Sequence, residues 1–127
     1  MNIGTIIYDR IQNVNISGFT TENVYPNVIA QGVEFPAVVY EIDRTNPERT
    51  KSGNSKVDTI AFNLYIFSND YDQCNSISDA IRDQLDGYRS IEDDCDKIIF
   101  VASNVAYESA SKVNVFIDTY EIRVKKW

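Results

Sequence analysis

The densest group of chemically capable side chains is the acidic run Glu92-Asp93-Asp94-Cys95-Asp96. Carboxylate oxygens are the ligands that hard cations such as calcium prefer. The run lacks the alternating ligand spacing and the turn glycine of a calcium-binding loop. We therefore interpret it first as a solvated acidic turn, with a partner-facing patch and an adventitious or structural cation site as alternatives. The surrounding negative charge disfavours a thiolate at Cys95, so we expect no reactive thiol there.

The remaining residues offer little catalytic chemistry. The chain has no histidine, which removes the commonest general base near neutral pH and the commonest metal ligand. Its five glycines are scattered and form no phosphate-binding loop. Carboxylate pairs such as Asp79 and Asp83, one helical turn apart, are expected wherever acids are this common. We therefore predict that the protein is not an enzyme, with no catalytic residue, no cofactor and no metal site.

The length and composition are those of one folded domain. At 127 residues, 43% of them hydrophobic, the chain fits a single domain spanning 1–127 with enough apolar surface for a core. No stretch reaches the roughly 18 apolar residues of a membrane span, and the first ten residues lack a secretory signal. We expect a soluble protein that is made in the cytoplasm and does not bind membranes. Its cysteines, Cys74 and Cys95, are then expected to be free thiols.

The charge is acidic overall and unevenly distributed. Twelve basic against nineteen acidic residues give a net charge of −7, which disfavours sequence-independent binding to nucleic acid because few basic side chains replace phosphate counterions. Residues 67–97 carry −6, whereas residues 44–56 carry +3, because one acid is outnumbered by four bases: Arg44, Arg49, Lys51 and Lys56. These segments are either solvated surfaces or complementary patches through which copies of the chain meet each other or a neighbouring ring.

The spacing of apolar residues predicts two helices and five strands. Isoleucines at helical spacing mark the first helix, and Asp70 followed by Gln73, with Gly87 at the far end, marks a capped second helix. Alternation of apolar and polar residues marks the strands. The predicted order is a helix over 2–14, strands at 24–25, 35–44 and 57–67, the second helix between 70 and 87, and strands over 98–107 and 112–125. This order is typical of an α+β fold, with an antiparallel β-sheet and both helices packed on one face.

Two features of the predicted sheet point to contacts with other chains. Residues 45–56 contain no apolar side chain and are punctuated by Pro47 and Gly53, so we predict a long exposed hairpin loop whose charge suggests a function. Tyr65 and Phe67 share the more polar face of the strand that follows. Aromatic side chains there are either covered by a helix or buried by another subunit, and the pattern does not choose between these two.

An ordered series of short motifs is similar to a known family. The opening amphipathic helix is followed by Val24-Tyr25-Pro26, Gln31-Gly32, Phe35-Pro36 with the Val38-Val39-Tyr40 strand, and Leu64-Tyr65-Ile66-Phe67-Ser68 running into Asn69-Asp70-Tyr71. In this order and at these distances, over roughly residues 3–90, the chain resembles the phage tail-completion and tail-terminator proteins. The closing pair of strands is compatible with the pattern but less distinctive.

The resemblance implies a structural role in the virion. Members of this family look like small α+β domains that assemble into rings, commonly sixfold, where the tail tube meets the head connector. The implied partners are further copies of the chain, the tail-tube protein and the head connector or stopper protein, with assembly in the host cytoplasm. DNA passes through the lumen of such a ring without specific binding. Six copies would carry a charge of about −42, so acid lining the lumen would repel DNA rather than trap it.

Seven residues are candidates for contacts within the ring or with the tube and connector. A ring of identical copies needs contacts between two different patches, and complementary charge and aromatic side chains suit such contacts. The candidates are Arg44, Arg49, Lys51, Lys56, Tyr65, Phe67 and Trp127. The alternative for Trp127 is a disordered chain end.

Two other functions stay open. One is a neck or tail-tube ring protein of the same fold, which charge and pattern do not distinguish from a terminator. The other is an acidic DNA mimic that inhibits a host protein. A mimic explains the charge of −7 but gains nothing from a basic loop.

Overall fold

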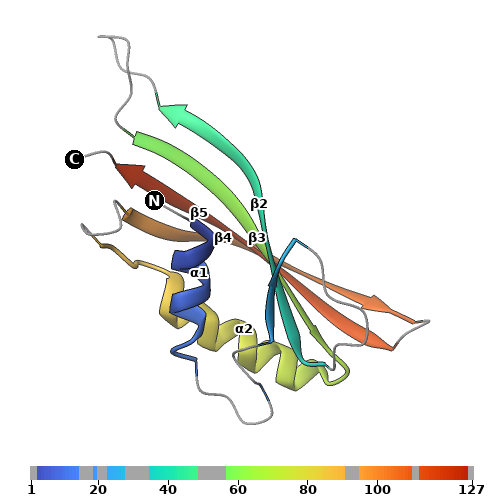
Figure 1. The fold of residues 1–127 in the computed structure, drawn as a ribbon. Coiled ribbons are helices and arrows are strands. Elements are labelled where there is room, and N and C mark those ends of the chain that lie inside the picture. The colour runs from blue at the N-terminus through green and yellow to red at the C-terminus, as the bar shows by residue number, and fades with distance from the viewer. Residues whose placement is uncertain are drawn as a thin grey trace.

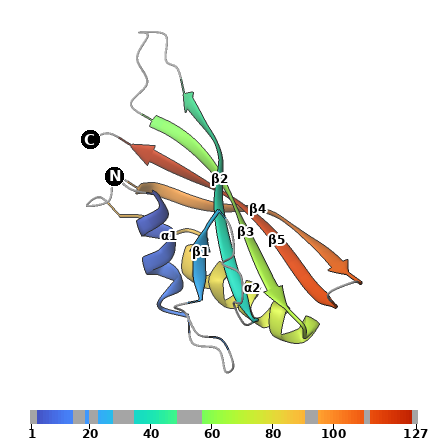
Figure 2. The ribbon, with the colours of Figure 1, turned by 45° about the vertical axis from the view of Figure 1, so that its right-hand side comes forward.

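The computed structural model describes residues 3–14, 19, 23–27, 35–48, 57–90, 95–109 and 112–125. The elements are α1 (Ile3–Ile11), β1 (Val24–Pro26), β2 (Ala37–Glu48), β3 (Val57–Ser68), α2 (Tyr71–Leu85), β4 (Cys95–Glu108) and β5 (Val113–Lys125). The strands form one sheet in the order β1-β2-β3-β5-β4, antiparallel except that β1 runs parallel to β2. Both helices lie on the same side of this sheet (Figures 1 and 2), so the predicted α+β class is confirmed.

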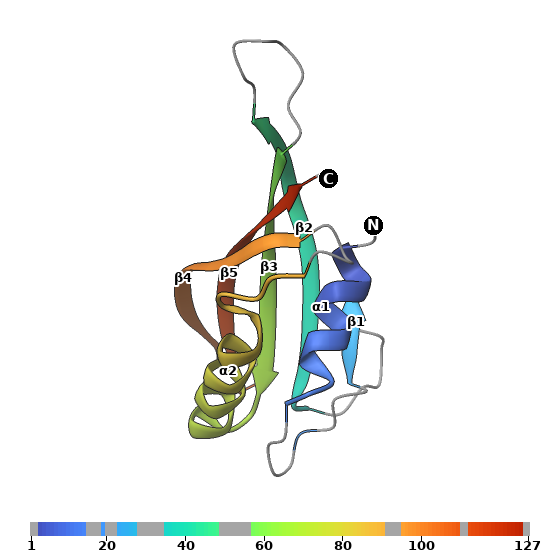
Figure 3. The same ribbon diagram turned by 90° about the vertical axis from the view of Figure 1, so that its left-hand side faces the viewer.

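The helix α1 forms because isoleucine recurs at helical spacing. Its four isoleucines at positions 3, 6, 7 and 11 are all buried. Arg10 donates hydrogen bonds of 3.0 and 3.2 Å to Gln84, and its guanidinium lies 4.3 Å from the ring centre of Tyr88. These contacts tie α1 to the end of α2, with α1 beside β1 and α2 farther along the sheet (Figure 3). The helix ends at Ile11, one turn before the predicted Val14, which is buried in the turn beyond.

The strand β2 is longer than the sequence predicts, because Pro47 does not end it. Instead of ending at Arg44, β2 continues to Glu48 opposite Val57, so four residues assigned to the hairpin loop are paired with β3. Among the described residues β2 has only β3 as a neighbour beyond Tyr40, since β1 pairs with residues 38–40 alone. Proline, which lacks an amide hydrogen, is tolerated on such an edge. The remainder of the predicted loop, 49–56, lies outside the described residues.

The second helix, α2, is capped at both ends as the sequence indicates. The carboxylate of Asp70 accepts the amide hydrogen of Asp72 at 3.0 Å. Gln73 does not complete the predicted capping box, because its side-chain oxygen accepts instead from the Ser68 hydroxyl at 2.7 Å. At the far end Gly87 has a φ of 82°, which glycine adopts without strain and which lets the chain leave the helix toward β4.

The core lies between the helices and the sheet. Phe62 and Ile66 of β3 are fully buried on the helix side, whereas Tyr65 on the other side is half-buried, so the two predicted faces of β3 are confirmed. The ring of Tyr120 stacks on Phe62 and meets the edge of Phe100, each at a centroid distance of 5.4 Å. Burying a large apolar side chain stabilises a fold by about 1.5–3 kcal/mol. This layer therefore fixes β3, β4 and β5 as one unit.

Candidate interaction surface

Tyr65 and Phe67 alternate along β3 with the buried core residues Leu64 and Ile66, so they face the other side of the sheet. Both described helices lie on the core side (Figure 1). The strand register places Tyr65 between Val39 and Ile117. Phe67 stacks on Phe35 with 6.0 Å between ring centres. Tyr65 and Phe67 are thus half-buried by neighbouring strands of the sheet and by Phe35, which precedes β2. Of the two alternatives left open by the sequence, cover by a described helix is wrong, and burial by another subunit stays a prediction.

The structure does not gather the seven predicted contact residues into one site. The backbone of Arg44 belongs to β2, opposite Ala61 and just after a register shift between Ile42 and Arg44. Tyr65 and Phe67 lie together on β3. The remaining four lie outside the described residues: Arg49, Lys51, Lys56 and Trp127. The basic loop therefore remains a prediction of the sequence.

A surface that the sequence did not single out lies on β4. All residues from Val101 to Ser109 are exposed. The exposed fractions of Val101, Val105 and Tyr107 are 49%, 52% and 60%. The far halves of β4 and β5 project beyond α2 (Figures 1 and 2). Apolar side chains exposed along an outer strand are typical of an interaction surface.

The segment that follows α2 covers the outer edge of the first half of β4, residues 95–100. The amide of Ile98 donates to the carbonyl of Tyr88 at 3.0 Å, and the carbonyl of Ile98 accepts from the amide of Gly87 at 2.8 Å. Two residues on, the amide of Phe100 donates to the carboxylate of Asp86 at 3.0 Å. A bulge after Phe100 marks the point where this cover ends.

No described segment covers the far half of the same edge, residues 101–108. The backbone N–H and C=O groups of Ile98 and Phe100 point away from β5. The one-residue bulge shifts the alternation, so beyond it the outward-pointing backbone groups are those of Ser103, Val105 and Tyr107. Within the described ranges no strand pairs with β4 on that side. Residues 98–107 contain neither a charged side chain nor a proline, the devices with which edge strands usually prevent pairing. We call residues 101–108 the open β4 edge.

A buried carboxylate holds α2 against this hairpin. Asp118 of β5 is fully buried and accepts hydrogen bonds from Ser78 of α2 at 2.5 Å and from Ser103 of β4 at 2.6 Å. Hydrogen bonds to an ionised acceptor are short and roughly twice as strong as neutral ones. The neighbouring Tyr120 hydroxyl is buried without a partner among the described residues, and burial, reinforced by Asp118, raises the pKa of Tyr120. The carboxylate fixes two elements and is closed to solvent, so its role is structural.

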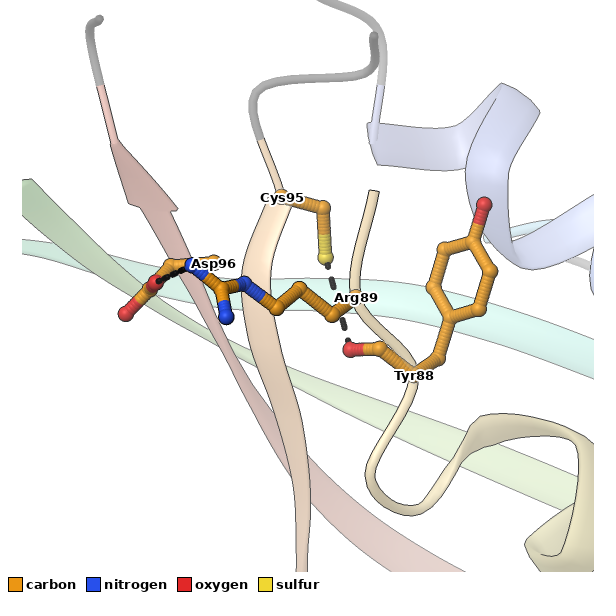
Figure 4. A network of polar contacts seen from close by, with 4 residues as sticks. All are labelled: Tyr88, Arg89, Cys95 and Asp96. Atoms are coloured by element: carbon orange, nitrogen blue, oxygen red, sulfur yellow. Dashed lines mark hydrogen bonds and ion pairs between the residues drawn. The ribbon is translucent and has the colours of Figure 1, made fainter. Parts of the chain in front are cut away.

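Both cysteines are buried and unbridged, as predicted. The Cys74 thiol donates to a backbone carbonyl of β3 at 3.1 Å, and burial raises the pKa of Cys74 to about 11. The Cys95 sulfur lies 3.9 Å from the carbonyl oxygen of Tyr88, beside an Arg89–Asp96 ion pair of 3.9 Å (Figure 4). Neither position presents a thiolate to solvent, so the thiols pack rather than react.

The described residues hold no group of three side chains suited to bind a metal ion, while positions 92–94 of the acidic run lie outside them. No described helix combines the length and the apolar character needed to cross a membrane.

The opposite edge of the sheet carries an open hollow. Its volume is about 410 Å³, and its lining residues are Gly4, Pro26, Asn27, Tyr40 and Ile42. It lies where β1 ends: the amide of Asn27 donates to the Tyr40 carbonyl at 2.8 Å, the last bond to β2 among the residues described on this side. Ile42, the next residue on the same face, is 46% exposed. We call residues 41–46 the open β2 edge.

Taken together, the fold and its surface define a small α+β structural module whose exposed features are strand edges. The profile of one family, tail completion protein gp17, matches residues 12–125, and the chain belongs to that family. It is therefore a structural protein of the phage tail and a component of the virion, which confirms the resemblance inferred from its sequence.

A solved structure shares the same fold. A chain from the structure titled "Virion of native gene transfer agent (GTA) particle" superimposes with a TM-score of 0.71 at 12% sequence identity. The match covers 94% of this chain and 92% of that chain. No curated protein sequence matches the chain.

Proposed function

We propose that copies of this chain form a ring, most simply a hexamer, at the junction of head and tail. The ring caps the tail tube and joins it to the head connector or stopper protein, and DNA passes through its lumen. The observation that carries the proposal is the family match over residues 12–125, since tail completion is the step at which a finished tail is closed. The same match favours a tail protein over an acidic inhibitor of a host protein.

The charge of the chain supports passage of DNA without binding. A net charge of −7 per copy gives a sixfold ring about −42, and like charge keeps DNA from adhering to a lumen that carries part of it. The likeness to a chain in a gene transfer agent virion supports a place in a DNA-carrying particle. A neck or tail-tube ring of the same fold shares these properties, so position along the particle is what the experiment must determine.

The predicted contact residues fit this role in two groups. Tyr65 and Phe67 lie on the uncovered side of the sheet and are proposed as apolar anchors toward a neighbouring subunit, with Trp127 as a third. Four basic residues are proposed to meet acidic surface on a neighbouring copy or on the tube or connector: Arg44, Arg49, Lys51 and Lys56.

The direct test is complementation of particles that lack the protein. An extract in which the gene is interrupted is expected to contain filled heads and unattached tails, and addition of purified protein is expected to restore joined, infectious particles. Electron microscopy of particles carrying an epitope-tagged chain then locates the label at the head–tail junction. Label along the tube or at the far tip of the tail, or joined particles without the protein, would refute the proposal.

A further inference from the structure

We propose that the open β4 edge of one copy pairs with the open β2 edge of a second copy, which extends the sheet from subunit to subunit. The inference rests on the proposed ring and specifies its interface. The open β4 edge presents outward backbone groups at Ser103, Val105 and Tyr107. The open β2 edge presents those of residues beyond Tyr40, where β1 stops.

The directions of the strands suit this pairing. Along the sheet β2 is antiparallel to β3, β3 to β5 and β5 to β4, so β2 and β4 run in opposite directions. When a second copy is related by rotation about an axis near the strand direction, its β2 meets β4 of the first in antiparallel order, and both copies keep the same face of the sheet inward. Such a contact joins two different patches and therefore propagates around a ring.

The exposed apolar side chains of the two edges lie on the same face of the sheet. Val105 pairs with Phe116, and Ile42 pairs with Phe62, and both partners belong to the core on the helix side. Cross-strand neighbours share a face, so Val105 and Ile42 point to the helix side as well. Beside Ile42 lies the hollow of about 410 Å³, which in this pairing would receive exposed side chains of the projecting hairpin. A second copy is thus complementary in both backbone and side chains.

The covered halves of the two strands set the offset between copies. Val105 is level with Val38 through the register Val105–Phe116–Ile66–Val38. The open part of β4 is therefore level with the part of β2 that β1 covers, and the open parts lie at opposite ends of the sheet. Neighbouring copies are consequently shifted along the strands, and in a closed ring the strands tilt relative to the axis, as in a barrel. Pro47 limits the paired length, because it has no amide to donate.

A proline substitution at one position tests whether the open β4 edge takes part in assembly. The amide of Val105 faces away from β5, so V105P removes an outward donor without removing a bond of the β4–β5 ladder, and V105T is the matched β-branched control. We expect V105T to keep the wild-type oligomer and V105P to weaken assembly at least tenfold in sedimentation measurements, with both variants keeping the wild-type circular dichroism spectrum. Assembly of V105P equal to that of V105T overturns the proposal.

Cysteine cross-linking in virions identifies the chain that pairs with the open β4 edge. This test does not depend on whether V105P folds. Particles carrying both I42C and V105C are expected to yield a ladder of disulfide-linked multimers, whereas either single variant stays a monomer; the native thiols are buried. Strong dimers from V105C alone would mean two-fold pairing of β4 with itself, and cross-links only to another virion protein would assign the edge to that partner. Either result overturns the inference. Its failure is distinguishable from failure of the proposed function, because protein labelled at the junction without this ladder refutes the interface alone.

Discussion

Removal of one hydroxyl from α2 is expected to cost more stability than its size suggests. Ser78 donates at 2.5 Å to Asp118, a fully buried carboxylate whose other described donor is Ser103. In the variant Ser78→Ala the carboxylate stays buried and loses one of these two charge-assisted bonds. Hydrogen bonds to charged groups contribute about 1.5–3 kcal/mol. Since 1 kcal/mol shifts the midpoint of a domain of this size by about 4 °C, the melting temperature should fall by roughly 6–12 °C relative to a matched alanine control on the same helix.

The matched control is Ser76→Ala on the exposed side of the same helix. Both substitutions gain the same helix propensity, about 0.5 kcal/mol in favour of alanine, so their difference isolates the bond to Asp118. Thermal and urea unfolding followed by circular dichroism measure both variants. The reasoning is refuted if the two alanine variants differ by less than about 0.5 kcal/mol, a difference too small for loss of a charge-assisted bond.

Three further predictions concern pH and assembly. Because burial raises the pKa of Cys74 from 9.0 to about 11, the folded state holds this proton more tightly than the unfolded state, so its stabilising contribution is complete below pH 9 and is lost as pH rises through 11. Urea unfolding at pH 8 and pH 10.5 should show this decline and a smaller one in Cys74→Ala; equal declines would contradict it. Replacing Tyr65 and Phe67 together with serine should reduce oligomer formation at least tenfold while lowering the unfolding free energy by only about 1.5–3 kcal/mol, because two half-buried side chains together equal one that is fully buried. An unaltered sedimentation profile would count against them as anchors. The charge of the predicted loop is reversed by replacing Arg49, Lys51 and Lys56 with glutamate. This variant should fail to join heads to tails and should keep the wild-type melting temperature. Normal yields of infectious particles would remove the loop from consideration.

The elements that local chemistry determines were predictable from the sequence. The isoleucine spacing of α1, the Asp70 cap and the left-handed Gly87 each act within a few residues, so their effect is visible in the sequence itself. The extent of β2 was not predictable in this way. Pro47 ordinarily interrupts a strand, and only the absence of a described neighbour on its outer side makes it acceptable, which is a property of the assembled sheet.

The order of strands explains why the sequence did not indicate the open β4 edge. Residues 98–107 and 112–125 were recognised as two strands, yet their alternation does not reveal which of them borders β3. The structure places β5 there, and β4 becomes the outer strand. The signal that was present is the ten-residue stretch without charge or proline, which is ordinary in a central strand and unusual at an edge. The side of the sheet on which Tyr65 and Phe67 lie was predictable, because it depends only on the alternation of residues along β3.

The proposed pairing of the two open edges would limit association to one kind. A sheet with a long uncharged edge is a template for uncontrolled pairing, and here half of each edge is already occupied, by β1 on one side and by residues 86–88 on the other. The remaining openings lie at opposite ends of the sheet, so the proposed pairing needs one orientation and one offset. A closed ring satisfies every opening, whereas a linear chain of copies leaves one of each exposed at its ends. In the proposed ring, partial cover of the β4 edge would take the place of the charged residues that usually protect an edge strand, and would direct pairing toward closure.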